Sequence, residues 1–276
     1  LDGAALASVV ARIAMMITSL VPAIRQYDAF APVRLRFGVR EFKTIFAFAL
    51  PAILTNLATP VGNAWVTRAV SDFGESAVAG MAVVGRLTPV AFAMVFALSG
   101  AIGPVFAQNA GANQLGRVRS ALNSALLLTL AYVLVGTVIL DLLRGPILLA
   151  IPVTSTGREL VLLFCGPLAL AWIFNGWLFV SNAAFNNLNH PFYSTSFNWS
   201  KNTLGTIPFV WLGGIWGGAP GVMIGQAVGG IVIALVAIVV AYRMISSGDD
   251  LCDQQPGLLR RLRQWGYPPN PHSTQR

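Results

Sequence analysis

Residues 219–246 read APGVMIGQAVGGIVIALVAIVVAYRMIS, and no charged side chain occurs in this stretch before Arg243. A helix needs about 20 mostly apolar residues to cross the hydrocarbon core of a bilayer. The stretch is therefore long and apolar enough to span a membrane. Pro220 stands near its start, where a missing N–H leaves no helical hydrogen bond unmade.

The composition of the whole chain also indicates a membrane protein. Of the 276 residues, 55% are apolar and 10% are charged, and the mean hydropathy is +0.69. Soluble domains carry about 25% charged residues, because a folded surface in water needs polar groups. This composition excludes a cytosolic enzyme, a nucleic-acid-binding module and a disordered tail. No spacing of His, Cys, Asp or Glu indicates a catalytic or metal site.

Similar apolar runs occur along most of the chain. None alternates with period two as a barrel strand does, and each is too long for such a strand. An all-α integral membrane protein with seven spans is therefore predicted. The runs are residues 3–23, 44–71, 77–108, 119–143, 159–186, 192–214 and 219–246.

The basic residues predict how the chain is oriented. The net charge is +8, and alternate loops carry 12 Lys and Arg on one side of the membrane against 3 on the other. Basic loops stay in the cytoplasm, which places segment 25–43 and the tail after Arg243 there. Within residues 33–40, apolar and basic residues alternate. A linker lying on anionic headgroups is the favoured interpretation, and a short strand is the alternative.

Small and polar residues follow helical spacing within the spans. Gly217, Gly221, Gly225 and Gly229 are four residues apart and form one bare stripe, which lets membrane helices approach closely. We expect Gly221, Gly225 and Gly229 to pack helices together. Polar residues form a stripe on each of three other runs, which either line one wet cavity or bond the helices to each other. These stripes are Asn56, Thr59 and Asn63; Asn175, Asn182 and Asn186; and Asn198, Lys201 and Asn202.

Five stretches carry a family resemblance through their order and spacing. They are Gly3–Val10, Ala79–Arg86, Ala97–Ser99, Gln108–Ala112 and Gly217–Gly230. Residues 79–112 resemble the eighth helix of multidrug and toxic compound extrusion (MATE) transporters. The first stretch is similar to the sixth helix of that family, and the last is similar to the start of the twelfth.

The resemblance implies two six-helix lobes that face each other across a central cavity. Residues 1–24 are then the last helix of an N-terminal lobe that this sequence lacks, and 25–43 are a cytoplasmic linker. Residues 44–246 form the six-helix C-terminal lobe, and 247–276 form a polar cytoplasmic tail.

The resemblance also implies an activity. Such a transporter exports cationic amphiphilic drugs or toxic compounds by antiport with sodium ions or protons. It works in the plasma (inner) membrane among lipids, as a monomer containing both lobes, without nucleic acid or a cofactor other than the coupling ion. The expected substrate cavity includes Asn56, Thr59, Asn63, Asn175, Asn182, Lys201 and Asn202.

One position departs from the family pattern. Some members carry a glutamate in the seventh helix and an aspartate in the tenth, which form a cation site. Asn175 stands in the place of that aspartate, and an amide holds neither a charge nor a proton. The coupling carboxylate is therefore expected in the absent lobe.

Two other functions compete with the antiporter. A lipid-linked oligosaccharide flippase of the same superfamily needs a strongly cationic cavity, for which Arg86 and Lys201 are the deep cations of this lobe. A membrane-embedded enzyme needs a general acid or base near an interface, and His190 is the candidate.

Overall fold

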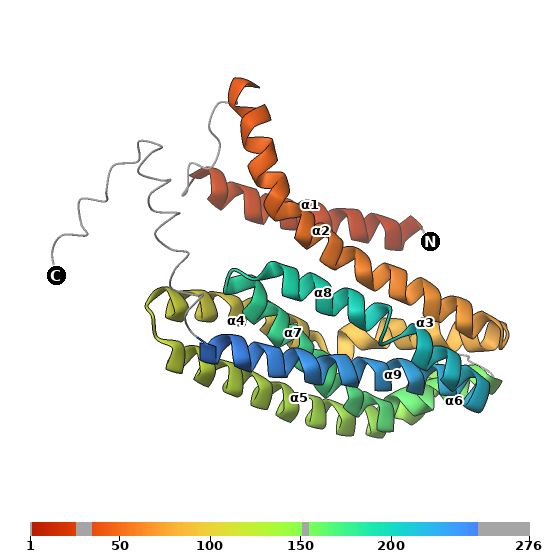
Figure 1. The fold of residues 1–276 in the computed structure, drawn as a ribbon. Helices are drawn as coiled ribbons and strands as arrows, with labels where there is room; N and C mark the ends of the chain where they lie inside the picture. The colour runs from red at the N-terminus through yellow and green to blue at the C-terminus, as the bar shows by residue number, and fades with distance from the viewer. Residues whose placement is uncertain (1, 26–34, 151–154, 248–276) are drawn as a thin grey trace. The chain divides into compact units, whose positions relative to one another are not determined.

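A computed structural model describes residues 2–25, 35–150 and 155–247, and every regular element in these ranges is a helix (Figure 1). The predicted all-α fold is confirmed. The elements are α1 (Asp2–Arg25), α2 (Leu35–Ser71), α3 (Glu75–Ala91), α4 (Ala93–Gly111), α5 (Leu115–Ala150), α6 (Ser155–Cys165), η1 (Pro167–Ala171), α7 (Trp172–Asn187), α8 (Pro191–Asn202) and α9 (Ile207–Ser247).

The chain divides into two compact units, Leu1–Ala49 and Leu50–Arg276. All side chains of the candidate site belong to the second unit. Four helical stretches of the described chain are long and apolar enough to cross a membrane. They are Ala93–Gly111, Leu115–Ala150, Pro167–Asn187 and Pro191–Ser247.

The structure places a helix in the second part of the predicted linker over 25–43. Residues 26–34 and the predicted tail from 248 on lie outside the described residues, but α2 already begins at Leu35. The alternative prediction of a short strand within residues 33–40 is wrong from Leu35 on, because these residues are helical. The Phe42 and Phe46 rings stack 5.7 Å apart, one helical turn from each other. Aromatic side chains at this spacing favour a helix, and strict alternation breaks down after Val39.

Three of the predicted spans are interrupted helices. The run 77–108 breaks at Phe92, between α3 and α4, and the run 159–186 is divided among α6, η1 and α7. The run 192–214 is interrupted between α8 and α9. Apolar composition predicts that a segment lies in the membrane, but it does not show where the backbone leaves the helix.

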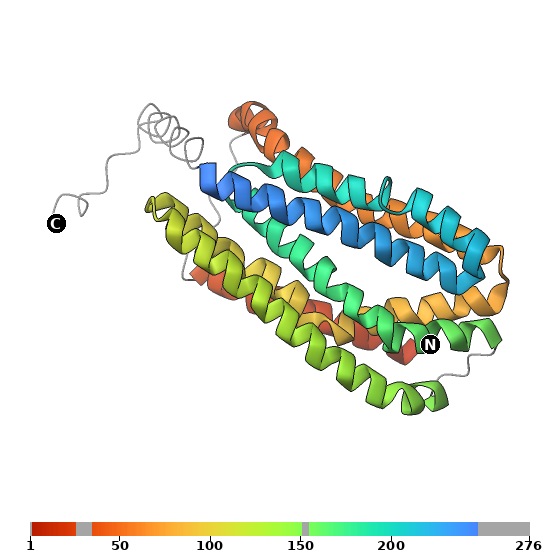
Figure 2. The same ribbon diagram turned by 60° about the horizontal axis from the view of Figure 1, so that its bottom comes forward.

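Helix α7 lies at the centre of the second unit. It packs against α4 and α5 on one side and against α8 and α9 on the other (Figure 2). Every residue from Val180 to Phe185 is buried, as expected of a helix with neighbours on all sides. Helices α3 and α6 also pack closely together. A Cβ built at Gly80 would lie only 2.6 Å from the Gly157 backbone, so there is no room for a side chain between the two helices at this point.

The last helix, α9, is a hairpin of two helical arms. It reverses at Gly218, whose φ of 58° and ψ of −145° are accessible to glycine at little cost. Ala219 and Pro220 begin the second arm. In Figure 1 the chain runs through α8 and the first arm, turns, and returns as the blue second arm. The two arms therefore run antiparallel.

Glycines line the contact between these two antiparallel segments. A Cβ built at Gly221 would overlap the Gly213 carbonyl, and one built at Gly225 would overlap the Phe209 carbonyl. A Cβ at Gly229 would overlap the carbonyl of Gly205, which lies two residues before the first arm. Gly217 has no atom within 4 Å of a built Cβ, so it lies outside this contact.

Candidate functional site

A half-buried lysine lies where α7, α8 and α9 meet. Lys201, near the end of α8, donates a hydrogen bond from Nζ to Asn175 Oδ1 at 2.5 Å. Its Nζ also lies 6.0 Å from the centre of the Phe179 ring. A Cβ built at Gly230 would lie 3.7 Å from the Lys201 Cε atom, so the bare backbone of α9 leaves room for the lysine chain.

Asn175 is oriented to meet this lysine. Its Nδ2 atom points to the carbonyl of Ala171 in the preceding turn, at 3.4 Å. The amide oxygen is therefore turned toward Lys201. The bond joins Asn175 on α7 to Lys201 on α8. It is therefore a bond between helices, one of the two interpretations of this polar stripe.

The Lys201 ammonium forms no ion pair with the carboxylates whose side chains are described, Asp72, Glu75, Asp141 and Glu159; the ion pair among these is Asp141–Arg144 at 3.0 Å. An amide dipole stabilises the ammonium group only partly. A charge held in a low-dielectric interior is costly unless an opposite charge compensates it. The arrangement therefore favours a negatively charged group beside Lys201.

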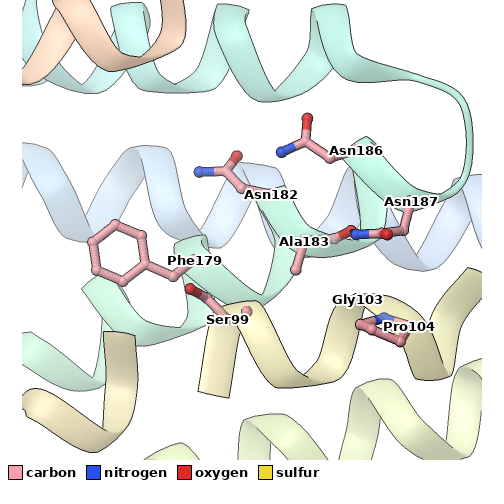
Figure 3. Close-up of a pocket in the computed structure, with 9 residues that line it drawn as sticks. Ser99, Gly103, Pro104, Phe179, Asn182, Ala183, Asn186 and Asn187 are labelled. Carbon is pink, nitrogen blue, oxygen red and sulfur yellow. The ribbon is translucent and has the colours of Figure 1, made fainter. Parts of the chain in front are cut away.

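A cavity of about 240 Å³ opens between α4 and α7 (Figure 3). Figure 3 shows Phe179, Asn182 and Asn186 projecting from one side of α7, as their spacing of three and four residues requires. Gly100, Gly103 and Ser99 of α4 form the opposite wall, with little side-chain volume. The full lining is Ser99, Gly100, Gly103, Pro104, Phe179, Asn182, Ala183, Asn186 and Asn187.

Asn182, a residue of the cavity lining, holds a buried hydrogen-bond acceptor without a partner. The residue is 8% exposed, and its Oδ1 atom is buried with no hydrogen-bond partner. Leaving a buried acceptor unpaired costs about 1–3 kcal/mol. By contrast, Asn187 Nδ2 donates to the Ala183 carbonyl at 2.8 Å, so that donor is occupied.

Phe179 connects the cavity with the lysine. One ring is both part of the cavity lining and 6.0 Å from Lys201 Nζ. Its centre lies 5.3 Å from that of Phe96 on α4, which holds it against the neighbouring helix. The Phe179 ring therefore lies next to both the cavity and the lysine, and the lysine itself is not part of the cavity lining.

The structure brings only some of the predicted cavity residues together. Asn175 and Lys201 pair, and Asn182 lines the cavity reached through Phe179. Asn202 is buried, donates to the Asn198 carbonyl, and lies against α2 at Gly62, where a Cβ would overlap it. The α2 residues Asn56, Thr59 and Asn63 are exposed and do not belong to the cavity lining.

Several lining residues were not predicted from the sequence. Ser99, Gly100 and Gly103 offer no charge or large side chain, so a search for polar stripes passes over them. The sequence feature that predicts them is the recurrence of small residues at one-turn spacing on α4. Small residues at this spacing leave space beside a helix. Asn187 was missed because it lies beside the predicted stripe rather than in it.

A family model, MatE, matches residues 51–212. The chain belongs to the MatE family. The members of this family are integral membrane transporters that handle small molecules, and they are not enzymes.

Two relatives and a solved structure show similarity to this MatE chain. An uncharacterized 21 kDa protein in the iaaL 5′ region of Pseudomonas savastanoi is 36% identical over 72% of this chain and 66% of its own length. A FAD transporter of Shewanella oneidensis is 28% identical over 71% of this chain and 43% of its own length. The Vibrio cholerae MATE transporter VcmN in the bent form has a TM-score of 0.74 at 21% identity, covering 91% of this chain and 57% of VcmN.

The chain therefore spans about half the length of VcmN and less than half that of the FAD transporter. At this level of identity the match to VcmN shows the shared fold. Within the described second unit, Phe179 lies beside both Lys201 and the α4–α7 cavity.

Proposed function

We propose that this chain contributes the C-terminal lobe of a secondary transporter that exports small amphiphilic molecules in exchange for sodium ions or protons. The transporter acts in the plasma membrane, surrounded by lipid, as a monomer with both lobes. Membership of the MatE family supports transport of small molecules. The mode of exchange and its direction are part of the proposal.

The proposed substrate carries a negatively charged group that pairs with Lys201. The half-buried Lys201 ammonium, held by an amide and by no described carboxylate, is the observation that carries this proposal. The relative named a FAD transporter supports it, because FAD bears phosphate groups. The sequence favoured a cationic substrate, which a fixed positive charge repels. That substrate is kept as the second candidate, since aromatic faces such as Phe179 attract cations.

The coupling ion is proposed to bind outside the second unit. The carboxylates whose burial is described, Asp72, Glu75, Asp141 and Glu159, are exposed or lie toward the ends of helices. Sodium and proton binding inside a membrane protein usually needs a buried carboxylate. A flippase of pyrophosphate-linked lipids is disfavoured, because its cavity needs several basic side chains. Among the Lys and Arg side chains whose burial is described, all but Lys201 are exposed.

The charge of Lys201 is tested with two flavins that share one ring system. Riboflavin 5′-phosphate is anionic and riboflavin is neutral. In proteoliposomes containing the complete transporter, we expect Lys201→Met to lower transport of the phosphate ester roughly 10-fold to 150-fold, the effect of losing a hydrogen bond to a charged group. Transport of riboflavin should change less than about twofold, because it makes no charge contact. Lys201→Arg, which keeps the charge, should retain most of the preference.

These rates are normalised to the amount of monodisperse folded protein. An unchanged ratio between the two flavins in Lys201→Met would contradict the proposed anionic substrate. Ethidium transported faster than either flavin by the unaltered protein would support the cationic substrate instead.

The orientation is tested by cysteine labelling in a background lacking Cys252. Cys165 is buried and is left in place. We expect Ser246→Cys, at the end of α9, to react with an impermeant thiol reagent only after cells are permeabilised. Ser71→Cys, at the end of α2, should react in intact cells because its loop is predicted outside. Both positions are exposed, so the reversed pattern would show the opposite orientation.

A further inference from the structure

We propose that the start of α5 and the end of α9 form a binding site for the headgroup of an anionic phospholipid. Arg119 of α5 supplies a positive charge, Asn123 supplies a second hydrogen-bond donor, and Tyr242 of α9 holds both side chains in place. The two segments lie at the same end of the second unit (Figure 1). The helices are in contact there, since Leu122 and Ile245 belong to one buried apolar cluster.

Tyr242 organises the polar side chains of α5. Its hydroxyl donates a hydrogen bond to Asn123 Oδ1, and the centre of its ring lies 6.0 Å from the Arg119 guanidinium carbon. Arg119 and Asn123 are four residues apart, so they project from the same face of α5. An arginine held over an aromatic face keeps the N–H groups at the edge of its plane for another partner.

Both α5 side chains are exposed and keep donors for a ligand. Arg119 forms no ion pair with the carboxylates whose side chains are described, among which Asp141 pairs with Arg144. Asn123 uses its Oδ1 atom to accept from Tyr242, and its Nδ2 group donates to no described residue. A guanidinium binds a phosphate group through two parallel N–H donors. The arrangement therefore suits a phosphate ester.

The charged side chains described at this end of the second unit are all basic. Arg117 stands beside Arg119 at the start of α5, and Arg243 lies near the end of α9. Asp141 lies about 33 Å further along α5. The other described carboxylates are at the opposite end of the unit, and they are Asp72, Glu75 and Glu159 (Figure 1). This distribution favours an anionic headgroup over a zwitterionic one, whose own positive charge would meet the arginines.

The helix faces that continue from these polar groups fit acyl chains. Leu127 follows Asn123 by four residues, and Val239 and Leu235 precede Tyr242 by three and seven, so each lies on the same face of its helix. All three apolar side chains are exposed. The orientation predicted from the sequence places this end in the cytoplasm, where the leaflet carries anionic lipids that bind basic pockets between helices. A lipid fills both parts of this surface, whereas a free phosphate ester fills only the polar part.

Native mass spectrometry of the complete transporter with added lipids tests the site, because it resolves each bound lipid molecule. We expect the unaltered protein to bind phosphatidylglycerol more tightly than phosphatidylcholine. Arg119→Gln should weaken binding of phosphatidylglycerol about fivefold, the effect of one basic side chain at an anionic surface, and leave phosphatidylcholine unchanged. Arg119→Lys, which keeps the charge but not the paired donors, should recover part of the loss. The melting temperature without added lipid should stay within a few degrees, because Arg119 is exposed.

Two control variants separate this site from other positive charges. Arg144→Gln removes an exposed arginine from the other end of α5, where Asp141 already pairs with it. Its affinity for phosphatidylglycerol should change less than about twofold. Lys201→Met should also leave phosphatidylglycerol binding unchanged, so the lipid site stands or falls independently of the proposed transport substrate.

Glycerol 3-phosphate distinguishes a lipid from a free phosphate ester, because it carries the phosphate without acyl chains. In large excess it should fail to displace phosphatidylglycerol. Displacement would show a site for free phosphate esters and would contradict the lipid. Equal affinity of the unaltered protein for the two lipids, or an unchanged preference for phosphatidylglycerol in Arg119→Gln, would overturn the site.

Discussion

We expect Gly225→Leu to destabilise the transporter by more than about 3 kcal/mol, above the usual range for overpacking. Even a single Cβ at this position would overlap the Phe209 carbonyl. The obstacle is backbone, which cannot rotate away as the end of a flexible side chain can. The two arms of α9 must then separate, and the bonds and contacts along the whole hairpin change with them. Folded yield in membranes and the melting temperature in detergent measure the effect.

Gly217→Leu is the matched control for this variant. It introduces the same side chain into the same glycine series, but its built Cβ meets no atom within 4 Å. We expect its melting temperature to stay within a few degrees of the unaltered protein, since surface substitutions away from specific contacts cost little. Equal loss of yield in both variants would show that the hairpin does not depend on close approach at Gly225.

The glycine stripe shows what can be predicted from the sequence. Four-residue spacing defines one face of a helix by geometry alone, so the spacing itself predicts that Gly221, Gly225 and Gly229 share a face. The opposing surface, formed by Gly205, Phe209 and Gly213, was not predicted. It depends on where the chain reverses, and the reversal at Gly218 fixes which residues stand opposite each other.

Helix interruptions were the least predictable part of the fold. Hydropathy is the same for a continuous and a broken apolar helix. Between α8 and α9, Thr203 Oγ1 donates to the Trp199 carbonyl at 2.7 Å, and Thr206 Oγ1 donates to the Lys201 carbonyl at 2.8 Å. Hydroxyl groups that satisfy freed carbonyls let a helix end inside a membrane. The sequence Thr203–Thr206, with Gly205 inside it, carries this signal.

The site was predicted residue by residue but not as pairs. Asn175, Asn182 and Lys201 were singled out because polar residues are costly in lipid. The bond between Asn175 and Lys201 depends on the register of α7 against α8, which local spacing does not determine. The same limit applies to α2, where helical spacing grouped Asn56, Thr59 and Asn63 but did not show that this face is exposed.

Two helix interruptions meet in an aromatic cluster next to the site. The Phe92 ring, at the break between α3 and α4, stacks on the Trp172 ring at the start of α7, with centres 4.8 Å apart and planes 10° apart. It also meets Phe164 edge to face at 6.3 Å. Tyr132 of α5 donates to the Ala91 carbonyl at 2.9 Å, which satisfies an acceptor beside the break. Phe92 therefore packs the break between α3 and α4 against the start of α7.

Phe92→Ala should consequently cost about 3–5 kcal/mol, the usual range for removing a fully buried aromatic side chain. Phe92 is 0% exposed, and its loss leaves both interruptions without their shared packing. Phe192→Ala is the control, because Phe192 is 70% exposed on α8 and truncation there should cost less than about 1 kcal/mol. Unfolding in denaturant, monitored for both variants in the same detergent, measures the difference. Phe92→Leu, which restores most of the volume, should recover part of the stability lost in Phe92→Ala. If Phe92→Ala were as stable as Phe192→Ala, the two breaks would be held by contacts other than this ring.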